Sequence, residues 1–153
     1  MDSNAVQILL VEDNPDDLEL ALHALRKDKL ANRIQVARDG EEALDYIFAR
    51  GPHAGPNGYN IPRLVLLDLK LPKVDGLEVL RQIKNDPRTK TIPVVILTSS
   101  KEQRDLVEGY RLGVNSYIQK PVDFDQFRET IKQIRLFWLV VNEPPPVEAL
   151  QAR

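Results

Sequence analysis

The sequence contains no cysteine, and its 21 basic and 23 acidic residues leave a net charge of only −2 at pH 7. Without cysteine the chain has no disulfide framework, no thiol nucleophile and no thiolate zinc site. The balanced charge argues against a nucleic-acid partner, which needs a concentrated basic face. Residues 1–11 match neither a signal peptide nor a membrane span. We therefore expect a cytoplasmic protein with no membrane contact.

The length and composition are those of one folded domain. The chain has 153 residues, of which 42% are hydrophobic, too high a fraction for a disordered protein. No internal repeat appears. We expect the domain to span residues 1–142 and residues 143–153 to form a flexible tail, because that segment is too short and too polar to fold alone.

Short, mostly apolar runs alternate with segments of helical periodicity. The expected strands are residues 6–11, 34–37, 64–67, 94–97 and 116–119. The expected helices are residues 15–29, 41–49, 76–85, 102–112 and 123–141. Residues 51–62, rich in glycine and proline, are expected to form a long loop. This alternation predicts an α/β domain with a mainly parallel sheet and right-handed crossovers.

Charged or hydroxyl side chains follow four of the expected strands. They are Glu12, Asp13, Asp68, Thr98 and Lys120. Ligands of open α/β sheets bind at the carboxyl ends of the strands, so we expect these side chains to meet there. Each residue alone is more often a turn, cap or solvated surface residue. The combination favours a site over coincidence.

The chemistry of that combination points to a divalent cation and an anion. Carboxylate oxygens suit Mg²⁺, which would also relieve the repulsion among three converging carboxylates. Lys120 and Thr98 offer an ammonium and a hydroxyl for phosphoryl oxygens. A carboxylate in such a site can itself accept a phosphoryl group.

Four segments, in order, resemble the receiver domains of bacterial two-component response regulators. They are residues 9–14 (LLVEDN), 68–76 (DLKLPKVDG), 96–99 (ILTS) and 117–121 (YIQKP). The resemblance implies a doubly wound, flavodoxin-like receiver fold, a five-stranded parallel sheet with helices on both faces. It also implies a signalling domain that assists its own phosphorylation and dephosphorylation, not an enzyme acting on other substrates.

The resemblance also implies a role for each matched residue. Asp68 would accept the phosphoryl group from a histidine kinase, in a reaction that requires Mg²⁺. The metal would be held by Asp13, Asp68 and the backbone carbonyl of Lys70, and by Glu12 through a water molecule. Thr98 and Tyr117 would form the switch, and Lys120 would contact the phosphoryl group. A cis bond between Lys120 and Pro121 would aim the lysine.

The last expected helix is apolar nearly all round at its end. Its expected core stripe is Phe124, Phe127, Ile131, Ile134, Trp138 and Val141. The patch expected at an interface comprises Leu136, Phe137, Trp138, Leu139 and Val140. Because a helix apolar on every side is buried, we favour a homodimer, with coverage by the tail as the alternative. The long loop and this apolar end resemble the small response regulators of cyanobacterial phytochromes, which implies a phytochrome kinase as partner.

Other classes fit the sequence less well. A phosphatase of the haloacid-dehalogenase type needs a second aspartate where Lys70 stands, and a nucleotide-binding domain needs a glycine-rich turn where residues 12–15 read EDNP. A serine hydrolase needs glycines around its nucleophile, and Ser99 and Ser100 have none. A receiver fold that serves only for docking or dimerisation, independently of phosphorylation, stays open as the alternative.

Overall fold

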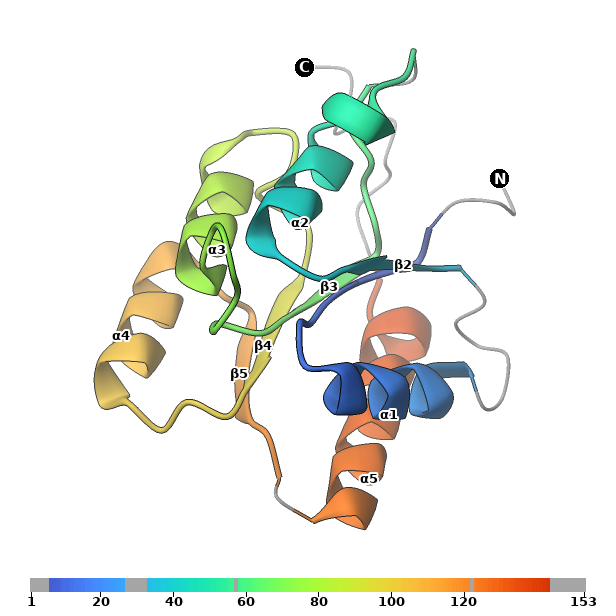
Figure 1. The fold of residues 1–153 in the computed structure, drawn as a ribbon, viewed down its shortest axis with the longest axis vertical. Coiled ribbons are helices and arrows are strands. Elements are labelled where there is room, and N and C mark those ends of the chain that lie inside the picture. Colours follow the sequence, from blue (N-terminus) through green and yellow to red (C-terminus); the bar gives the residue numbers. More distant parts are fainter. Residues whose placement is uncertain (1–5, 27–32, 57, 122, 144–153) are drawn as a thin grey trace.

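The computed structural model describes residues 6–26, 33–56, 58–121 and 123–143. They form one parallel sheet covered by helices on both faces (Figure 1). The strands are β1 (Ile8–Val11), β2 (Ile34–Ala37), β3 (Leu64–Leu67), β4 (Val94–Thr98) and β5 (Ser116–Gln119). The helices are α1 (Pro15–Arg26), α2 (Gly40–Ile47), α3 (Gly76–Asn85), α4 (Gln103–Leu112) and α5 (Phe124–Arg135). The strand order β2-β1-β3-β4-β5 is that of the doubly wound, flavodoxin-like fold, which confirms the predicted fold class.

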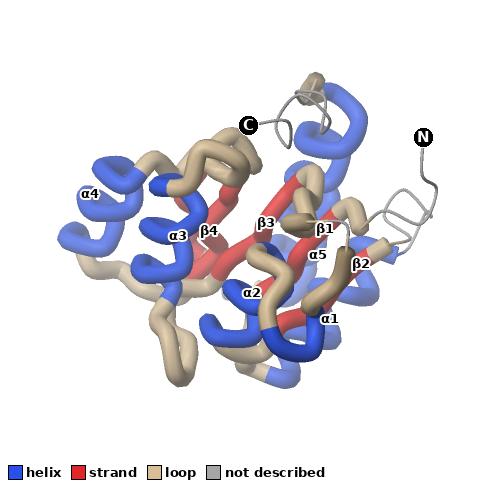
Figure 2. Tube along the Cα trace, turned by 90° about the horizontal axis from the view of Figure 1, so that it is seen from above, coloured by secondary structure: helices blue, strands red, loops and turns tan. Residues whose placement is uncertain are grey.

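Alternate residues of each central strand face opposite layers of helices. In β1, Leu9 and Val11 pack with α2 and α3, whereas Ile8 and Leu10 pack with α1 and α5. Figures 1 and 2 show α1 and α5 together on one face and the strands in the interior. Because β1, β3 and β4 are buried on both faces, their sequences read as unbroken apolar runs.

Polar side chains cap the N-termini of α1 and α3. Asn14 accepts hydrogen bonds from the backbone N–H groups of Asp16 and Asp17, both at 3.0 Å. This contact makes Asn14 the cap of α1 and fixes the turn that leads out of β1. Asp75 caps α3 in the same way, accepting from the backbone of Glu78 at 3.0 Å.

The loop between β3 and α3 is held by a glycine. A Cβ on Gly76 would lie 2.3 Å from the carbonyl oxygen of Asp68 and 2.6 Å from the Cα of Leu69. The Gly76 N–H also donates to the Leu69 carbonyl at 2.9 Å. Only glycine therefore allows α3 to begin this close to the end of β3, which places the backbone of Asp68 against the helix.

The described residues between 51 and 62 form the predicted loop and include a short 3₁₀ turn, Gly51–His53. The loop is fastened to the end of α2 by Asn60, whose backbone N–H donates to Ile47 and whose side chain donates to the Tyr46 carbonyl. The loop leads into the first residue of β3, Leu64, at the opposite end of that strand from Asp68.

The last helix departs from the predicted register. The α-helix ends at Arg135, and Leu136–Val141 continues as a π-helical segment in which Asn142 donates to the Phe137 carbonyl at 2.7 Å. An i→i+5 helix places Leu139, five residues after Ile134, in the core with an exposed fraction of 6%. A uniform period of 3.6 residues per turn predicts Leu139 off the core, and the π-helical segment corrects this prediction.

Several expected positions on this helix are therefore corrected. Phe124 and Val141, expected in the core, are exposed, while Phe127, Ile131 and Ile134 are buried as predicted. The assignment of Leu139 to the interface patch is wrong, because Leu139 is buried. Trp138, also expected in that patch, packs partly against the core. The exposed apolar residues at this end are Leu136, Phe137, Val140 and Val141, named here the C-terminal patch.

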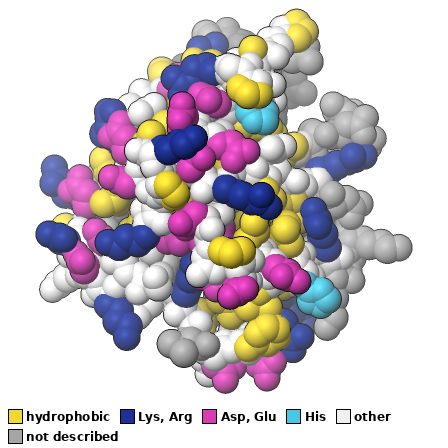
Figure 3. Space-filling view, viewed as in Figure 1, with side chains coloured by type: hydrophobic (Ala, Val, Ile, Leu, Met, Phe, Trp, Pro, Cys, Tyr) yellow, Lys and Arg dark blue, Asp and Glu magenta, His cyan; other side chains and the backbone are white. Residues whose placement is uncertain are grey.

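Charges of both signs are interspersed over the face shown in Figure 3, where no basic area gathers. Among the described residues, none of the helices has the length and apolar content that a membrane crossing requires. The helical part of the domain ends at Val141, and the predicted tail lies outside the described residues from position 144 onward.

Candidate functional site

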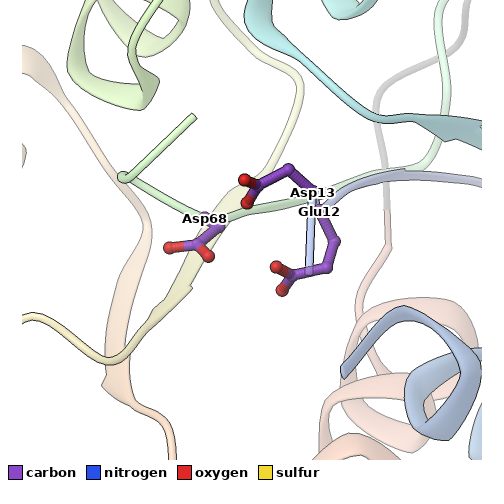
Figure 4. Close-up of side chains that lie close together, drawn as sticks. All are labelled: Glu12, Asp13 and Asp68. Atoms are coloured by element: carbon purple, nitrogen blue, oxygen red, sulfur yellow. The ribbon is translucent and has the colours of Figure 1, made fainter. Parts of the chain in front are cut away.

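The carboxylates predicted to meet do so at the carboxyl ends of β1 and β3. Glu12 and Asp13 follow β1, Asp68 follows β3, and their side chains lie close together (Figure 4). One oxygen from each lies within 4.8 Å of the others. Glu12 and Asp68 are buried, whereas Asp13 is exposed at the rim. Parallel pairing of β1 with β3 brings the two strand ends level, Val11 opposite Leu67.

Lys120, which follows β5, reaches into this acidic cluster. Its ammonium Nζ lies 2.7 Å from Glu12 Oε1, 2.8 Å from Asp17 Oδ2 and 3.1 Å from Asp68 Oδ2. The side chains of Lys120, Glu12 and Asp68 are only 6–7% exposed, so their contacts are shielded from water, whereas the Asp17 side chain is 32% exposed. One cation therefore serves three carboxylates, and the site stays rich in negative charge.

The crowding of charges changes the protonation of the buried groups. Burial raises the pKa of Glu12 to about 7, with Lys120 opposing the shift and the Asp68 charge adding to it. Burial alone would lower the pKa of Lys120, but its bonds to Asp17 and Glu12 and the charge of Asp68 raise it above the ordinary value. Lys120 is thus a permanent cation at neutral pH, which suits a partner for an anion.

The other oxygen of Asp68 is held by the backbone. Asp68 Oδ1 accepts from the N–H of Leu69 at 2.7 Å and lies 3.4 Å from the N of Lys70. The carboxylate is therefore fixed in direction before any ligand arrives, one oxygen toward the loop and the other toward Lys120.

Thr98 is the last residue of β4 and is fully buried. Its backbone lies next to that of Lys120, which follows the neighbouring strand β5. The Lys120 N–H donates to the Thr98 carbonyl at 2.7 Å, which ties the ends of β4 and β5 together. The hydroxyl oxygen of Thr98 accepts from the Ser100 N–H at 3.3 Å. Because that contact uses the oxygen as an acceptor, the hydroxyl proton of Thr98 stays available to donate.

Tyr117 lies in β5, half-buried against the core layer of α2, α3 and α4. Its hydroxyl is buried and finds no hydrogen-bond partner among the described residues. Burial raises the pKa of this phenol. The role of Tyr117 in the switch stays a prediction.

One geometric prediction for the site is wrong. The described residues contain no cis peptide bond, so the bond between Lys120 and Pro121 is trans. The trans form is favoured even before proline, by about 0.5–1 kcal/mol. Lys120 reaches Asp68 from this trans backbone, so the expected bond is not needed for the contact seen here.

A groove of about 400 Å³ opens onto the acidic cluster. It is lined by Asp13, Leu69, Lys70, Leu71, Pro72, Asp75, Leu77 and Asp105. The groove lies between the loop after β3 and the first turn of α4, and it reaches Asp13 at the rim of the cluster. The backbone carbonyl of Lys70 stays a predicted ligand.

Sequence reasoning missed three polar residues of this region. Asp17, in the first turn of α1, contacts Lys120 at 2.8 Å. Ser100 and Asp105 bond each other at 2.6 Å beside the groove. A first helical turn lies directly above a strand end in this fold, and that proximity is the signal that points to Asp17 and Asp105.

The donor set suits a hard divalent cation. Three carboxylates and no histidine or thiol meet here, and oxygen-only ligands are those preferred by Mg²⁺ and similar ions. The net negative charge left after Lys120 is counted also favours a cation. The residues present therefore fit the metal that the resemblance implies.

Comparison with known proteins agrees with this geometry. A sequence profile described as "Response regulator receiver domain" matches residues 8–132. A probable methanogenesis regulatory protein, FilR2, of Methanothrix harundinacea is 46% identical over 90% of this chain and 86% of its own length. The response regulator Rcp1 of Synechocystis sp. is 38% identical over 86% of this chain and 88% of its own length.

Solved structures of similar proteins share the fold. The phosphorylated cyanobacterial phytochrome response regulator RcpA superposes with a TM-score of 0.85 at 41% identity, covering 93% of this chain and 99% of that one. The bacteriophytochrome response regulator AtBRR is 55% identical, with a TM-score of 0.69 and coverage of 91% and 99%. The Mn²⁺-bound form of Rcp1 gives a TM-score of 0.83 at 37% identity, with coverage of 91% and 98%.

The profile match spans most of the chain, the relatives match nearly end to end, and the acidic cluster lies where the resemblance predicts. The protein belongs to the response regulator receiver domain family, and its relatives include response regulators of phytochromes.

Proposed function

We propose that this chain is a cytoplasmic, stand-alone response regulator that accepts a phosphoryl group on Asp68 from a histidine kinase of the phytochrome type. The observation that carries the proposal is the Asp68 carboxylate, fixed by Leu69 on one side and by the Lys120 ammonium at 3.1 Å on the other. The carboxylate lies beside two further acids and a groove that opens to solvent.

The transfer forms one bond and breaks one. A carboxylate oxygen of Asp68 bonds to phosphorus as the bond from phosphorus to the imidazole nitrogen of the donor breaks, and the imidazole leaves with that electron pair. Lys120 places its positive charge beside the oxygens that arrive, and the Thr98 hydroxyl is free to donate to them. Such a transfer needs mainly positioning and charge neutralisation, and the buried groups supply both.

The metal is part of the proposal. Glu12, Asp13, Asp68 and the carbonyl of Lys70 would hold Mg²⁺. The ion supplies the charge that allows an anionic donor to approach a site already rich in carboxylates. Support comes from the oxygen-only donor set here and from the Mn²⁺-bound form of the relative Rcp1.

The direct test is a mass measurement. We expect the protein to gain the mass of one phosphoryl group when incubated with Mg²⁺ and either a small acyl phosphate or a phytochrome-type histidine kinase with ATP. Chelation of the metal should prevent the gain. Absence of labelling from both donors in the presence of Mg²⁺ would overturn the proposal.

Asp13→Asn should separate stability from metal binding. Asp13 is exposed and lies among like charges, so its neutralisation should raise the metal-free free energy of unfolding by about 0.5–2 kcal/mol. Mg²⁺ should raise the melting temperature of the wild type but much less that of the variant, because a ligand is lost. Calorimetric scans at low salt, with and without Mg²⁺, measure both effects.

Asp16→Asn is the matched control for this prediction. Asp16 is equally exposed and stands in the first turn of α1, where its charge favours the helix dipole. We expect a small loss of stability and an unchanged response to Mg²⁺. An Asp13→Asn protein that responds to Mg²⁺ like the wild type would remove Asp13 from the proposed ligands.

We also propose that signalling proceeds through protein contacts and that the chain forms a homodimer through the C-terminal patch. Phe137 and Val140 in this patch are 48% and 58% exposed, large fractions for such apolar side chains. Thr98 and Tyr117 are the proposed switch that alters these contacts on phosphorylation, a shift between two populations.

Val140→Glu should weaken the dimer. A charge placed within the patch would have to be buried without a partner, so the molar mass measured by light scattering should fall toward that of a monomer. Gln133→Glu adds the same charge at an exposed position of α5 outside the patch and should leave the mass unchanged. A monomeric wild type, or a dimeric Val140→Glu protein, would contradict this interface.

A further inference from the structure

Asp105, in the first turn of α4, contacts residues of two different loops, one after β4 and one after β3. Its Oδ2 atom accepts a hydrogen bond from the Ser100 hydroxyl at 2.6 Å. The same atom lies 3.9 Å from the ammonium of Lys70, in the loop after β3. The Asp105 side chain is only 13% exposed and lines the groove beside the acidic cluster. One carboxylate thus links α4 to the loop that carries the proposed phosphoacceptor.

Ser100 extends this link to Thr98. The Ser100 N–H donates to the Thr98 hydroxyl oxygen at 3.3 Å, and the Ser100 hydroxyl accepts from the Glu102 N–H, also at 3.3 Å. The start of α4 is therefore held by a buried serine whose donated proton goes to Asp105. A change at Thr98 or at Asp105 reaches the same helical turn.

Lys70 is the movable member of the group. Its side chain is 61% exposed, and its ion pair with Asp105 is long and monodentate. Lys70 is also two residues from Asp68, and its backbone N lies 3.4 Å from Asp68 Oδ1. A phosphoryl group on Asp68 would bring more negative charge than Asp105 carries to the same end of the loop, so it would compete for this ammonium.

We propose that Asp105 is a positioning residue that ties the first turn of α4 to the unphosphorylated pocket, and that a phosphoryl group on Asp68 loosens this tie by attracting Lys70. The inference rests on the proposed phosphoacceptor role of Asp68. It assigns to α4, whose Val107 and Tyr110 are 52% and 54% exposed, a mobility that depends on the state of the pocket. Loss of the Lys70 pair leaves Asp105 without a cation and weakens its hold on the loop.

Hydrogen exchange of the full chain tests the inference. Asp105→Asn keeps an oxygen that can accept from Ser100 but removes the charge that holds Lys70. In the unphosphorylated variant we expect amides of Gln103–Leu112 to exchange about threefold faster or more than in the wild type. Phosphorylation of the wild type with a small acyl phosphate should produce a similar increase, and it should add little further in the variant.

Two other variants make the test specific. Glu102→Gln removes a carboxylate from the start of the same helix. Glu102 pairs with Arg104 and does not line the groove, so the amides of α4 should exchange as in the wild type. Lys70→Gln leaves the bond between Asp105 and Ser100 but removes the cation that moves. In the Lys70→Gln protein, phosphorylation should no longer increase amide exchange in α4. This test is independent of whether Asp105→Asn folds.

The outcomes distinguish this inference from the proposed function. Wild-type protein that takes up no phosphoryl group refutes the phosphoacceptor proposal. The comparison of unphosphorylated wild type with unphosphorylated Asp105→Asn still tests whether Asp105 holds the first turn of α4. Wild-type protein that is labelled, with unchanged exchange in α4, overturns the inference alone. Equal exchange in unphosphorylated Asp105→Asn and wild type would also overturn it.

Discussion

Asp68→Asn should abolish phosphorylation while leaving the fold intact. An amide is not a nucleophile toward phosphorus, so labelling by an acyl phosphate or a kinase should fall by more than about a thousandfold. The asparagine oxygen can still accept from the Leu69 N–H, which holds the side chain in the native structure at 2.7 Å. Intact-mass measurement over time gives the rate, and the circular dichroism spectrum reports the fold.

Asp123→Asn serves as the control for the acceptor. Asp123 caps α5 by accepting from the Gln126 N–H at 3.0 Å, and asparagine caps helices equally well. We expect this variant to be labelled like the wild type. Labelling that persists in Asp68→Asn would assign the acceptor to another residue, which peptide mapping of the labelled protein would then identify.

Gly76→Ala should damage both stability and phosphorylation. The new methyl group would meet backbone atoms of Asp68 and Leu69 at 2.3 and 2.6 Å, and backbone cannot rotate away as a flexible side chain can. We expect a loss of about 2–3 kcal/mol in the free energy of unfolding, as for other overpacked sites. Displacement of Asp68 by about 1 Å should also slow labelling by about a hundredfold.

Gly55→Ala is the matched control, because a Cβ at Gly55 would meet no atom within 4 Å. Its unfolding midpoint in urea and its labelling rate should stay near those of the wild type. A Gly76→Ala protein with wild-type stability would show that the loop and α3 separate easily. The tight approach of the helix to the acceptor strand would then have no functional importance.

The sheet and the acidic cluster were predictable for a common reason. Strands such as β1, β3 and β4 are buried on both faces, so each is an apolar run that ends abruptly at Glu12, Asp68 or, in β4, at Thr98. The parallel arrangement then brings those ends together without any knowledge of loops. The N-cap role of Asn14 is also predictable, because the preference of asparagine for helix N-termini depends only on neighbouring residues.

Features that depend on three-dimensional packing were not predictable in this way. The contacts of Asp17 and Asp105 arise from where a helix begins above the sheet, and their sequence context resembles any acidic first turn. The π-helical end of α5 moves Leu139 into the core through one additional residue in the turn, which a fixed period cannot anticipate. The cis bond expected before Pro121 rested on the family resemblance alone, and the bond is trans.

The pairing of β1 with β3 aligns Ile8 with Leu64 and Val11 with Leu67, and it sets both the sorting of side chains and the height of Asp68. A slip of β3 by one position would turn Leu64 and Leu66 toward the wrong helices and carry Asp68 away from Glu12. Misaligned molecules would thus be unstable and unresponsive at once. A cell that degrades poorly folded chains would, by the same act, remove the copies unable to receive a signal.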